Sequence, residues 1–350
     1  MKKNNIRKKL IMSLVIFAIC VVNFGATIFF NTSVVFAYSA TDYDFTDELE
    51  EDRVGIGFTW NAEDRILNIT GIKNNSAILK LPENSTIDIQ GNIENTIGGL
   101  ICNGNLLIKG NNTASLNVTG CNCSTPIGYL SCMSIYDTLT IENGNLKIAC
   151  NGVSYTTAQS TYAGVYSKKI IINGGKLDIN VGGLRSKSQI LYAIFNMDTL
   201  TINNGTVHIE VKEGFGIRGK SNINSGNIEV ITDTTYSAFK EVPSINPTID
   251  WKISYSNNSE TEEIEADITD IYNIYNSSII KISKAIMIGD LDGDGKVNIK
   301  DLNRLYGYLN ETSELTEQEL KYADVNGDGK INVKDLNRLY EHISEVNPLF

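Results

Sequence analysis

The segment LTIENGNLKI, at residues 139–148, returns in altered form along the middle of the chain and decides the fold. Its best-aligned counterparts are IIINGGKLDI (170–179), LTINNGTVHI (200–209) and SNINSGNIEV (221–230), and LLIKGNNTASLNV (106–118) is the same unit with a longer turn. In each segment apolar residues alternate with polar ones on either side of an Asn, Gly or Ser turn. This period of two predicts short strands with one buried face.

These units start 33, 31, 30 and 21 residues apart, and a third short apolar element precedes each of them, at 99–102, 129–132, 164–166, 193–195 and 216–218. Three short strands in each unit are typical of a parallel β-helix, in which a coil buries its inward face only by stacking on its neighbours. We expect Leu139, Ile141, Leu146 and Ile148 to point inward. An antiparallel β-sandwich is the alternative, because Asn-Gly is a strong hairpin signal. The recurrence of Leu and Ile at one register favours the β-helix.

The flanks of the repeats predict caps for this solenoid. Strands at 54–60 and 65–70, joined by a turn at 61–64, predict an N-terminal hairpin, with Trp60 over the open end. Strands at 249–255 and 279–283 are expected to close the other end.

The stretch FTWNAEDRILNITG (58–71) and the repeated L-T-I-x-N-G-x-L-x-I extend over roughly 200 residues. This region resembles the right-handed β-helix domains of exported Gram-positive carbohydrate-binding proteins, including pectin-binding ones related in fold to pectate lyases. The resemblance implies a right-handed coil and a plant polysaccharide as partner. Its motifs are structural, so it indicates the fold more than the ligand.

A catalytic site has little support in the sequence. The chain has two histidines, and neither has a nucleophile at a recognisable spacing. Pectate lyases use an arginine base beside aspartates that hold calcium, and Arg218 lies on a comparable strand, but matching coils carry Tyr166 and Phe195 instead of aspartates. Arg218 is therefore a weak catalytic candidate. Tyr166, Phe195 and Phe239 are expected at equivalent positions, either inside the core, which we favour, or as an outward strip for sugar rings.

Two near-copies near the C-terminus, DLDGDGKVNIKDLNRLY (290–306) and DVNGDGKINVKDLNRLY (324–340), share 13 of 17 residues. Oxygen-bearing side chains stand at loop positions 1, 3, 5, 9 and 12, a spacing that suits the six to eight oxygen ligands of Ca²⁺ and differs from the EF-hand loop in having Asp at position 12. At position 7, Lys296 and Lys330 contribute only a backbone carbonyl. The side-chain ligands are Asp290, Asp292, Asp294, Asn298 and Asp301 in the first loop, and Asp324, Asn326, Asp328, Asn332 and Asp335 in the second. The sequence thus predicts two Ca²⁺ ions.

Each loop is followed by an amphipathic segment that predicts a helix, at 299–309 and 333–343, and a capping box at 316–319 predicts a short helix between them. The unit at 286–350 resembles the type I dockerin modules of cellulosome-type complexes. The resemblance implies an all-α domain that docks, with calcium, to a cohesin module of a scaffold protein. The contact positions it implies are Ile299, Lys300, Arg304, Tyr306, Val333, Lys334, Arg338 and Tyr340. Because both copies present nearly the same face, we expect docking in two orientations; the cohesin class stays open.

The charge distribution and the cysteines bear on where the protein is located, which partners it binds and whether it forms disulfides. The first 37 residues have a basic start, an apolar run and Val35-Phe36-Ala37 as a cleavage site, which predicts an export signal. Without its five basic residues the net charge falls from −11 to −16, which argues against nucleic acid and, after cleavage, against membranes as partners. The five other cysteines lie at 102–150, in an odd number and without zinc spacing, so they are expected to be small buried residues or to form one local disulfide.

Together these patterns predict a mainly β, secreted chain. Its parts are a signal peptide (1–37), a flexible lead-in (38–52), a parallel β-helix with a hairpin cap (53–285) and a dockerin domain (286–350). The favoured function is a cellulosome-type component in polysaccharide catabolism, whose β-helix binds plant polysaccharide. A catalytic polysaccharide lyase or glycoside hydrolase, and a structural or adhesive surface protein, are the alternatives.

Overall fold

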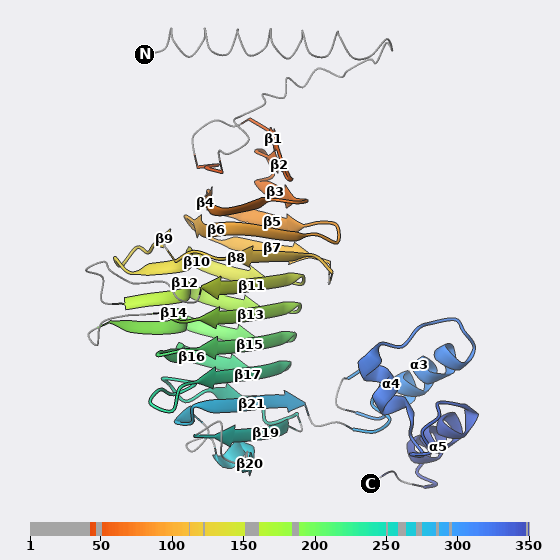
Figure 1. Ribbon diagram of the computed structural model, residues 1–350. Helices are drawn as coiled ribbons and strands as arrows, with labels where there is room; N and C mark the ends of the chain where they lie inside the picture. The colour runs from red at the N-terminus through yellow and green to blue at the C-terminus, as the bar shows by residue number, and fades with distance from the viewer. Residues whose placement is uncertain are drawn as a thin grey trace, which may run out of the picture.

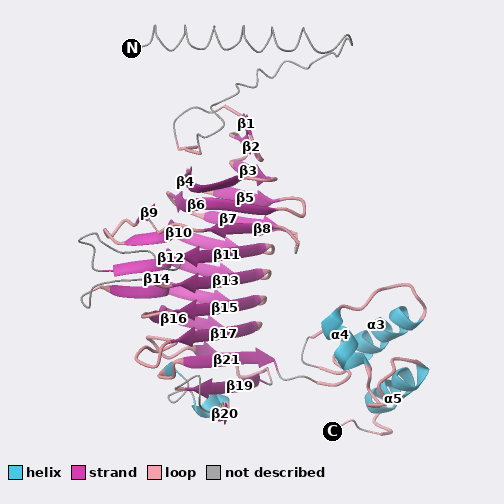
Figure 2. Cartoon of the chain, in the orientation of Figure 1, coloured by secondary structure: helices cyan, strands magenta, loops and turns pink. Residues whose placement is uncertain are grey.

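The computed structural model describes residues 43–46, 51–111, 113–121, 123–150, 161–183, 189–249, 251–257, 264–270, 275–284, 287–293, 296–347 and 349 (Figure 1). The segment 1–37, where we expect an export signal, lies outside these residues. Among the described helices, none combines the length and the apolar character that crossing a membrane requires. Strands dominate the chain and α-helices follow them near the C-terminus (Figure 2), which confirms the expected class.

The strands of the first half are β1 (Arg53–Gly55), β2 (Phe58–Asn61), β3 (Ile66–Ile69), β4 (Lys73–Leu81), β5 (Ser85–Ile89), β6 (Glu94–Cys102), β7 (Leu106–Gly110), β8 (Ser115–Val118), β9 (Cys123–Ser124), β10 (Leu130–Ile141) and β11 (Asn145–Cys150). The second half has β12 (Thr161–Ile172), β13 (Lys176–Val181), β14 (Ile190–Ile202), β15 (Thr206–Val211), β16 (Phe215–Ile223), β17 (Asn227–Thr232), β18 (Ser244–Ile245), β19 (Trp251–Ser256), β20 (Ile264–Ala266) and β21 (Ile279–Lys284). A 3₁₀ turn (Ile268–Asp270) and the helices α3 (Ile299–Leu309), α4 (Glu317–Ala323) and α5 (Val333–Ile343) complete the elements. We call residues 53–284 the strand stack.

Most strands of the stack pair in parallel with their counterparts one unit further along the chain. Leu139 of β10 pairs with Leu106 of β7 and with Ile170 of β12, which is followed by Leu200 of β14. A second ladder joins β8, β11, β13, β15 and β17, also in parallel. These are the registers expected of a parallel β-helix; the solenoid itself and the handedness of its coil stay predictions.

The strands on either side of each Asn-Gly turn do not form a hairpin in the described residues. β10 and β11 flank the turn at 142–144, yet each pairs with strands of neighbouring units. The hairpin interpretation of these turns is therefore wrong. From β10 onward the expected third strand of a unit is not separate, because it runs on into the next strand: the element at 193–195 is part of the 13-residue β14. The element at 99–102 instead ends β6, and β7 begins separately at Leu106.

The core of the strand stack is a continuous set of aliphatic ladders. Leu139, Ile141, Leu146 and Ile148, the residues expected to point inward, are all 0–1 % exposed. Burying one such side chain contributes about 1.5–3 kcal/mol relative to exposure. All five cysteines outside the export segment are buried and free, which confirms their expected place in the core.

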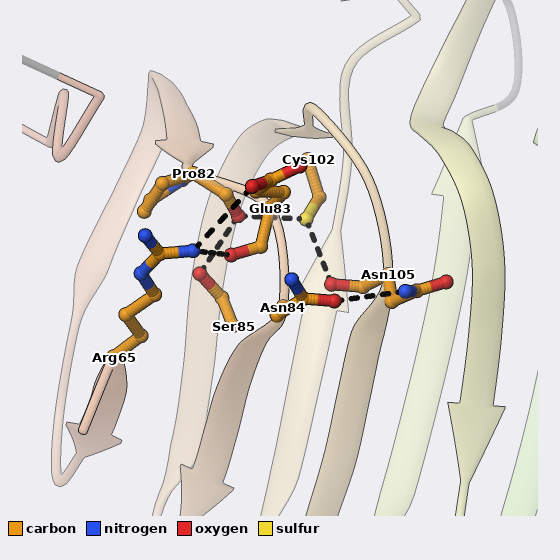
Figure 3. A network of polar contacts seen from close by, with 7 residues as sticks. All are labelled: Arg65, Pro82, Glu83, Asn84, Ser85, Cys102 and Asn105. Carbon is orange, nitrogen blue, oxygen red and sulfur yellow. Dashed lines mark hydrogen bonds and ion pairs between the residues drawn. The ribbon is translucent and has the colours of Figure 1, made fainter.

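Hydrogen bonds link turns that stack on one another in neighbouring coils. In Figure 3, the side-chain amide of Asn105 donates to Oδ1 of Asn84 over 2.8 Å, and the Cys102 thiol donates to the carbonyl of Pro82 over 3.2 Å. The hydroxyl of Ser85 also donates to that carbonyl, over 2.8 Å. Two of these bonds connect the turn at 82–85 with the turn at 102–105 in the next coil.

Side-chain hydrogen bonds between successive turns continue further along the stack and form an asparagine ladder. Asn224 donates to Oδ1 of Asn203, and Asn203 donates to Oδ1 of Asn173, both over 2.7 Å. Asn173 in turn donates to the carboxylate of Glu142 over 2.9 Å. The Asn residues of the repeat, which as hairpin signals favoured a sandwich, instead bond from turn to turn along the stack.

Antiparallel strands are found at both ends of the stack. β1, β2 and β3 form a meander at the N-terminal end, where the ring of Trp60 packs against Phe45 with centroids 5.0 Å apart. The expected single strand at 54–60 is divided, because Gly57 turns with φ +79° between β1 and β2. At the other end β21 pairs antiparallel with β17 and β19, as closing strands should.

A substitution at Gly175 can test how closely the turns of neighbouring coils pack. It has φ +73°, and a Cβ added there would lie 2.3 Å from the carbonyl oxygen of Gly144 in the coil before. We predict that Gly175→Ala lowers the free energy of unfolding by about 2–5 kcal/mol, from about 1–2 for the left-handed backbone and about 1–3 for overpacking. Urea denaturation followed by circular dichroism measures it.

Gly91→Ala is the matched control, because Gly91 has φ +76° but open space where a Cβ would be. It should lose only the backbone contribution, about 1–2 kcal/mol. Equal losses in the two variants would show that the turns do not pack as closely as described.

Candidate metal centre and docking surface

Helices α3 and α5 begin in the same way because the sequences around their first turns repeat. The side chain of Asn298 caps α3 by accepting from the backbone N–H of Lys300, and Asp301 closes the capping box by accepting from the N–H of Asn298. Asn332 and Asp335 do the same for α5. The bounds of α3 and α5 are those predicted, and α4 follows its predicted cap, Thr316.

The first loop brings three carboxylates together. One oxygen each of Asp290, Asp292 and Asp301 lies within 4.8 Å of the others. Asp301 is held from three sides: Oδ1 accepts from the N–H groups of Leu291 (2.8 Å) and Asp292 (3.0 Å), and Oδ2 accepts from Asn298 (2.8 Å). The residue that caps the helix therefore also closes the loop.

The electrostatics of this loop fit a bound cation. Asp301 is 0 % exposed, and burial raises the pKa of its carboxyl although the N–H donors lower it in part. The neighbouring charge of Asp292 raises it further. A buried carboxylate beside two others is unstable by itself, and a divalent cation would offset both the desolvation and the repulsion. The donors are oxygens, as a hard cation such as Ca²⁺ prefers.

The second loop has the same frame. Asp335 is 0 % exposed and accepts from the N–H groups of Asn326 (3.1 Å) and Asn332 (2.8 Å). The carboxylate of Asp324 accepts from the N–H groups of Asp328 (3.0 Å) and Gly329 (2.8 Å), which curls the loop around it. This loop would hold a second cation through Asp324, Asn326, Asp328 and Asp335.

The structure also places the lysines expected to contribute only their carbonyls. Lys296 and Lys330 have exposed side chains, and their backbone carbonyls accept from the side-chain amides of Asn298 (3.5 Å) and Asn332 (3.3 Å). Asp294, expected at position 5 of the first loop, lies outside the described residues. Metal ligation by these residues stays a prediction.

Apolar side chains at the expected contact positions of α3 and α5 point into solvent. Ile299 and Tyr306 are 56 % and 58 % exposed on the first helix, and Val333 and Tyr340 are 61 % and 60 % exposed on the second. Lys300 and Lys334 are exposed beside them. A groove of about 630 Å³ runs between the helices and is lined by Leu302, Asn303, Tyr306, Leu336, Asn337 and Tyr340, the same residue types from each copy.

The two arginines expected at this surface differ from each other. Arg304 forms an ion pair with Glu319 of α4, which raises the pKa of the arginine. Burial raises the pKa of Glu319, but hydrogen bonds from Arg304 and Thr316 lower it overall. Arg338 instead donates to the carbonyl of Asn347. The two copies are therefore alike in their apolar contacts but not in their arginines.

A second candidate site lies on the outside of the strand stack. Tyr129, Tyr166, Tyr192, Phe195 and Phe215 pack with Ala163 into a cluster separate from the aliphatic core, and we call it the outer aromatic cluster. Tyr166 pairs with Phe195, and Phe195 with Arg218, on successive coils. The guanidinium carbon of Arg218 lies 4.1 Å from the ring centroid of Phe195 and 5.8 Å from that of Tyr192.

Beside this cluster is a hollow of about 510 Å³ that we call the Arg218 hollow. It is lined by Phe195, Asn196, Met197, Asp198, Arg218, Gly219, Lys220 and Glu241. Lys240 lies nearby, with its ammonium 4.1 Å from the ring centroid of Phe215. The hollow thus combines charged groups of both signs with the ring of Phe195.

The prediction for the aromatic residues was right in part. Tyr166 and Phe195 are 2 % exposed, but they are covered on the outer side and not inside the coil. Phe239 is a core residue paired with Ile217, one position away from the expected register. Sequence reasoning missed Tyr192, Lys220 and Glu241 as neighbours of Arg218, because the register between β14 and β16 shifts between Phe195 and Thr199.

Comparisons with known proteins concern the helical unit. Residues 288–344 match the family described as the dockerin type I domain. No match was found among curated proteins or among solved structures. The matched residues contain both acidic loops and all three helices described above, and they begin after the strand stack ends. The C-terminal helical unit of this chain is therefore a dockerin type I domain.

Proposed function

We propose that this chain is a secreted component of a cellulosome-type complex, in which the dockerin domain attaches a polysaccharide-binding strand stack to a scaffold. The observation that carries the attachment is the family match together with two duplicated acidic loops, each closed by a buried aspartate, Asp301 or Asp335. Dockerin domains bind Ca²⁺ and dock to cohesin modules. The proposed boundaries are 1–37 for the signal, 53–285 for the strand stack and 286–350 for the dockerin domain.

Calcium acts here through the helix caps. Asp301 and Asp335 each serve a loop and the first turn of the following helix. Filling each loop with one Ca²⁺ would therefore fix the start of α3 and of α5, and with it the exposed residues on both helices. The dockerin core has few buried apolar side chains, and small domains of this kind commonly need a metal for stability.

Docking would use the apolar faces of α3 and α5. Exposed aromatic and aliphatic side chains that lie around a groove are typical of interface hot spots. The matching exposures of Ile299 and Val333, and of Tyr306 and Tyr340, support two docking orientations of similar affinity. The cohesin would contact one helix face in each orientation.

Polysaccharide binding would use the Arg218 hollow. The stacked guanidinium of Arg218 is held over Phe195, so its N–H edges are oriented before a ligand arrives. Arginine binds carboxylates in a bidentate manner, so an acidic, uronate-containing polysaccharide such as pectin suits this site best. Lys220 and Lys240 add positive charge, while Asp198 and Glu241 do not belong to a calcium cluster in the described residues.

A catalytic role is the second candidate, because the Arg218 hollow also contains two carboxylates. Asp198 and Glu241 line it together with the arginine, and glycoside hydrolysis needs a carboxylate pair. The cation–aromatic contact favours binding, since it holds the guanidinium of Arg218 against the ring of Phe195.

The calcium ligands can be tested one loop at a time. We predict that the chain binds two Ca²⁺ ions and that Asp301→Ala and Asp335→Ala each remove one binding event, because each aspartate closes its own loop. Isothermal titration calorimetry gives the stoichiometry. Glu314→Ala, at an exposed acidic residue between α3 and α4, should keep both ions. Two unchanged binding events in Asp301→Ala would contradict the assignment.

Docking in two orientations predicts an unusual mutational pattern. Ile299→Asp with Tyr306→Ala, or Val333→Asp with Tyr340→Ala, should weaken cohesin binding only about twofold, because one of two equivalent modes remains. All four substitutions together should weaken it about a hundredfold or more, the loss of hot-spot residues. Lys321→Ala on α4 is the control. A large loss from either pair alone would show a single orientation.

The Arg218 hollow predicts retention of the full chain on acidic polysaccharide in affinity gels. Arg218→Ala should reduce that affinity by about 1.5–3 kcal/mol, on the order of tenfold to a hundredfold, the contribution of hydrogen bonds to a charged group. Lys147→Ala, at an exposed cation on β11, should bind normally. Absence of retention on any plant polysaccharide would refute the binding role, and release of unsaturated or reducing products that stops in Arg218→Ala would establish the enzyme instead.

A further inference from the structure

Three cysteine side chains meet inside the strand stack. Cys121 lies just before β9, Cys132 is in β10, and Cys150 is the last residue of β11. Their Sγ atoms are all within 4.8 Å of one another, and the residues are 4 %, 0 % and 1 % exposed. They come from three separate segments of the chain, so the coil brings them together, not local sequence.

The other two buried cysteines have different surroundings. The Cys102 thiol lies within hydrogen-bond distance of the carbonyls of Pro82 (3.2 Å) and Asn105 (3.3 Å), which share its one hydrogen. The Cys123 thiol donates to the carbonyl of Cys132 over 3.4 Å, and burial raises the pKa of Cys123 to about 12. Both behave as satisfied core residues, and neither belongs to the group of three.

We propose that Cys121, Cys132 and Cys150 form a binding site for one thiophilic metal cation of the Cu⁺ or Zn²⁺ class. Thiolate sulfurs bonded to such an ion at about 2.3 Å lie roughly 4 Å apart, so the observed triangle needs adjustments of less than about 1 Å. Sulfur donors select soft cations over Ca²⁺ or Mg²⁺. Within the described residues no histidine or carboxylate joins the group.

The thiol protons bear on this site, because a cation that binds the three sulfurs as thiolates replaces them. Sγ of Cys121 also lies 3.6 Å from the carbonyl oxygen of Ala163.

A disulfide explains the arrangement less well. It would use two of the three sulfurs and leave the third buried against the bond with no role. A metal site gives all three an equivalent role, and it would also tie three consecutive segments of the stack together.

The test uses the reduced full chain with Cys20→Ala, so that the five cysteines of the strand stack are the only thiols. Cd²⁺ is added in the presence of excess Ca²⁺, and thiolate-to-cadmium charge-transfer absorption is followed in the ultraviolet. Cd²⁺ bound by oxygen in the dockerin loops gives no such band. We expect the band to saturate at one equivalent, and to disappear in Cys121→Ala, Cys132→Ala and Cys150→Ala.

Cys102→Ala and Cys123→Ala are the controls and should keep the band. A second measurement needs no substitution: iodoacetamide labelling in mild denaturant, mapped by mass spectrometry, should show that Cd²⁺ protects three cysteines and leaves Cys102 and Cys123 reactive. Absence of the band, its equal loss in the controls, or a disulfide among the three in the protein as secreted would each overturn the proposal. None of these three results would affect the proposed dockerin function.

Discussion

In-register stacking of aliphatic side chains is the constraint on which the rest of this structure depends. Each unit is too short to bury its own Leu and Ile residues, so it is stable only against its neighbours. The register that aligns Leu106, Leu139, Ile170 and Leu200 also aligns everything else at those positions. The asparagine ladder follows that alignment, whereas the outer aromatic cluster lies on the other side of the register shifts in β10, β12 and β14.

The dockerin domain depends on a different interaction. Its core is small, and two of its buried aspartates, Asp301 and Asp335, each accept backbone N–H groups from both the loop and the helix cap. Such carboxylates are costly to bury without a cation. The cation site and the fold of the domain are therefore coupled, which would make the docking faces on α3 and α5 depend on calcium.

Much of this could be predicted from sequence because the signals are local. The bounds of α3 and α5 follow from Asn caps and a leucine stripe, and the inward residues follow from a period of two. What could not be predicted depends on how coils stack. Alternation cannot tell the two faces of a strand apart when both are apolar, so Tyr166 and Phe195 could not be placed outside. An offset of one residue moved Phe239 into the core, and the triangle of Cys121, Cys132 and Cys150 has no sequence spacing of its own.

The central claim is that this chain attaches to a scaffold through a calcium-dependent dockerin domain. Calorimetry of the full chain against a panel of scaffold cohesins, in calcium and again with EDTA, tests it most directly. We expect saturable binding to at least one cohesin in calcium, complete loss in EDTA and recovery when calcium is restored. Binding of equal affinity in EDTA, or no binding to any cohesin in calcium, would contradict it.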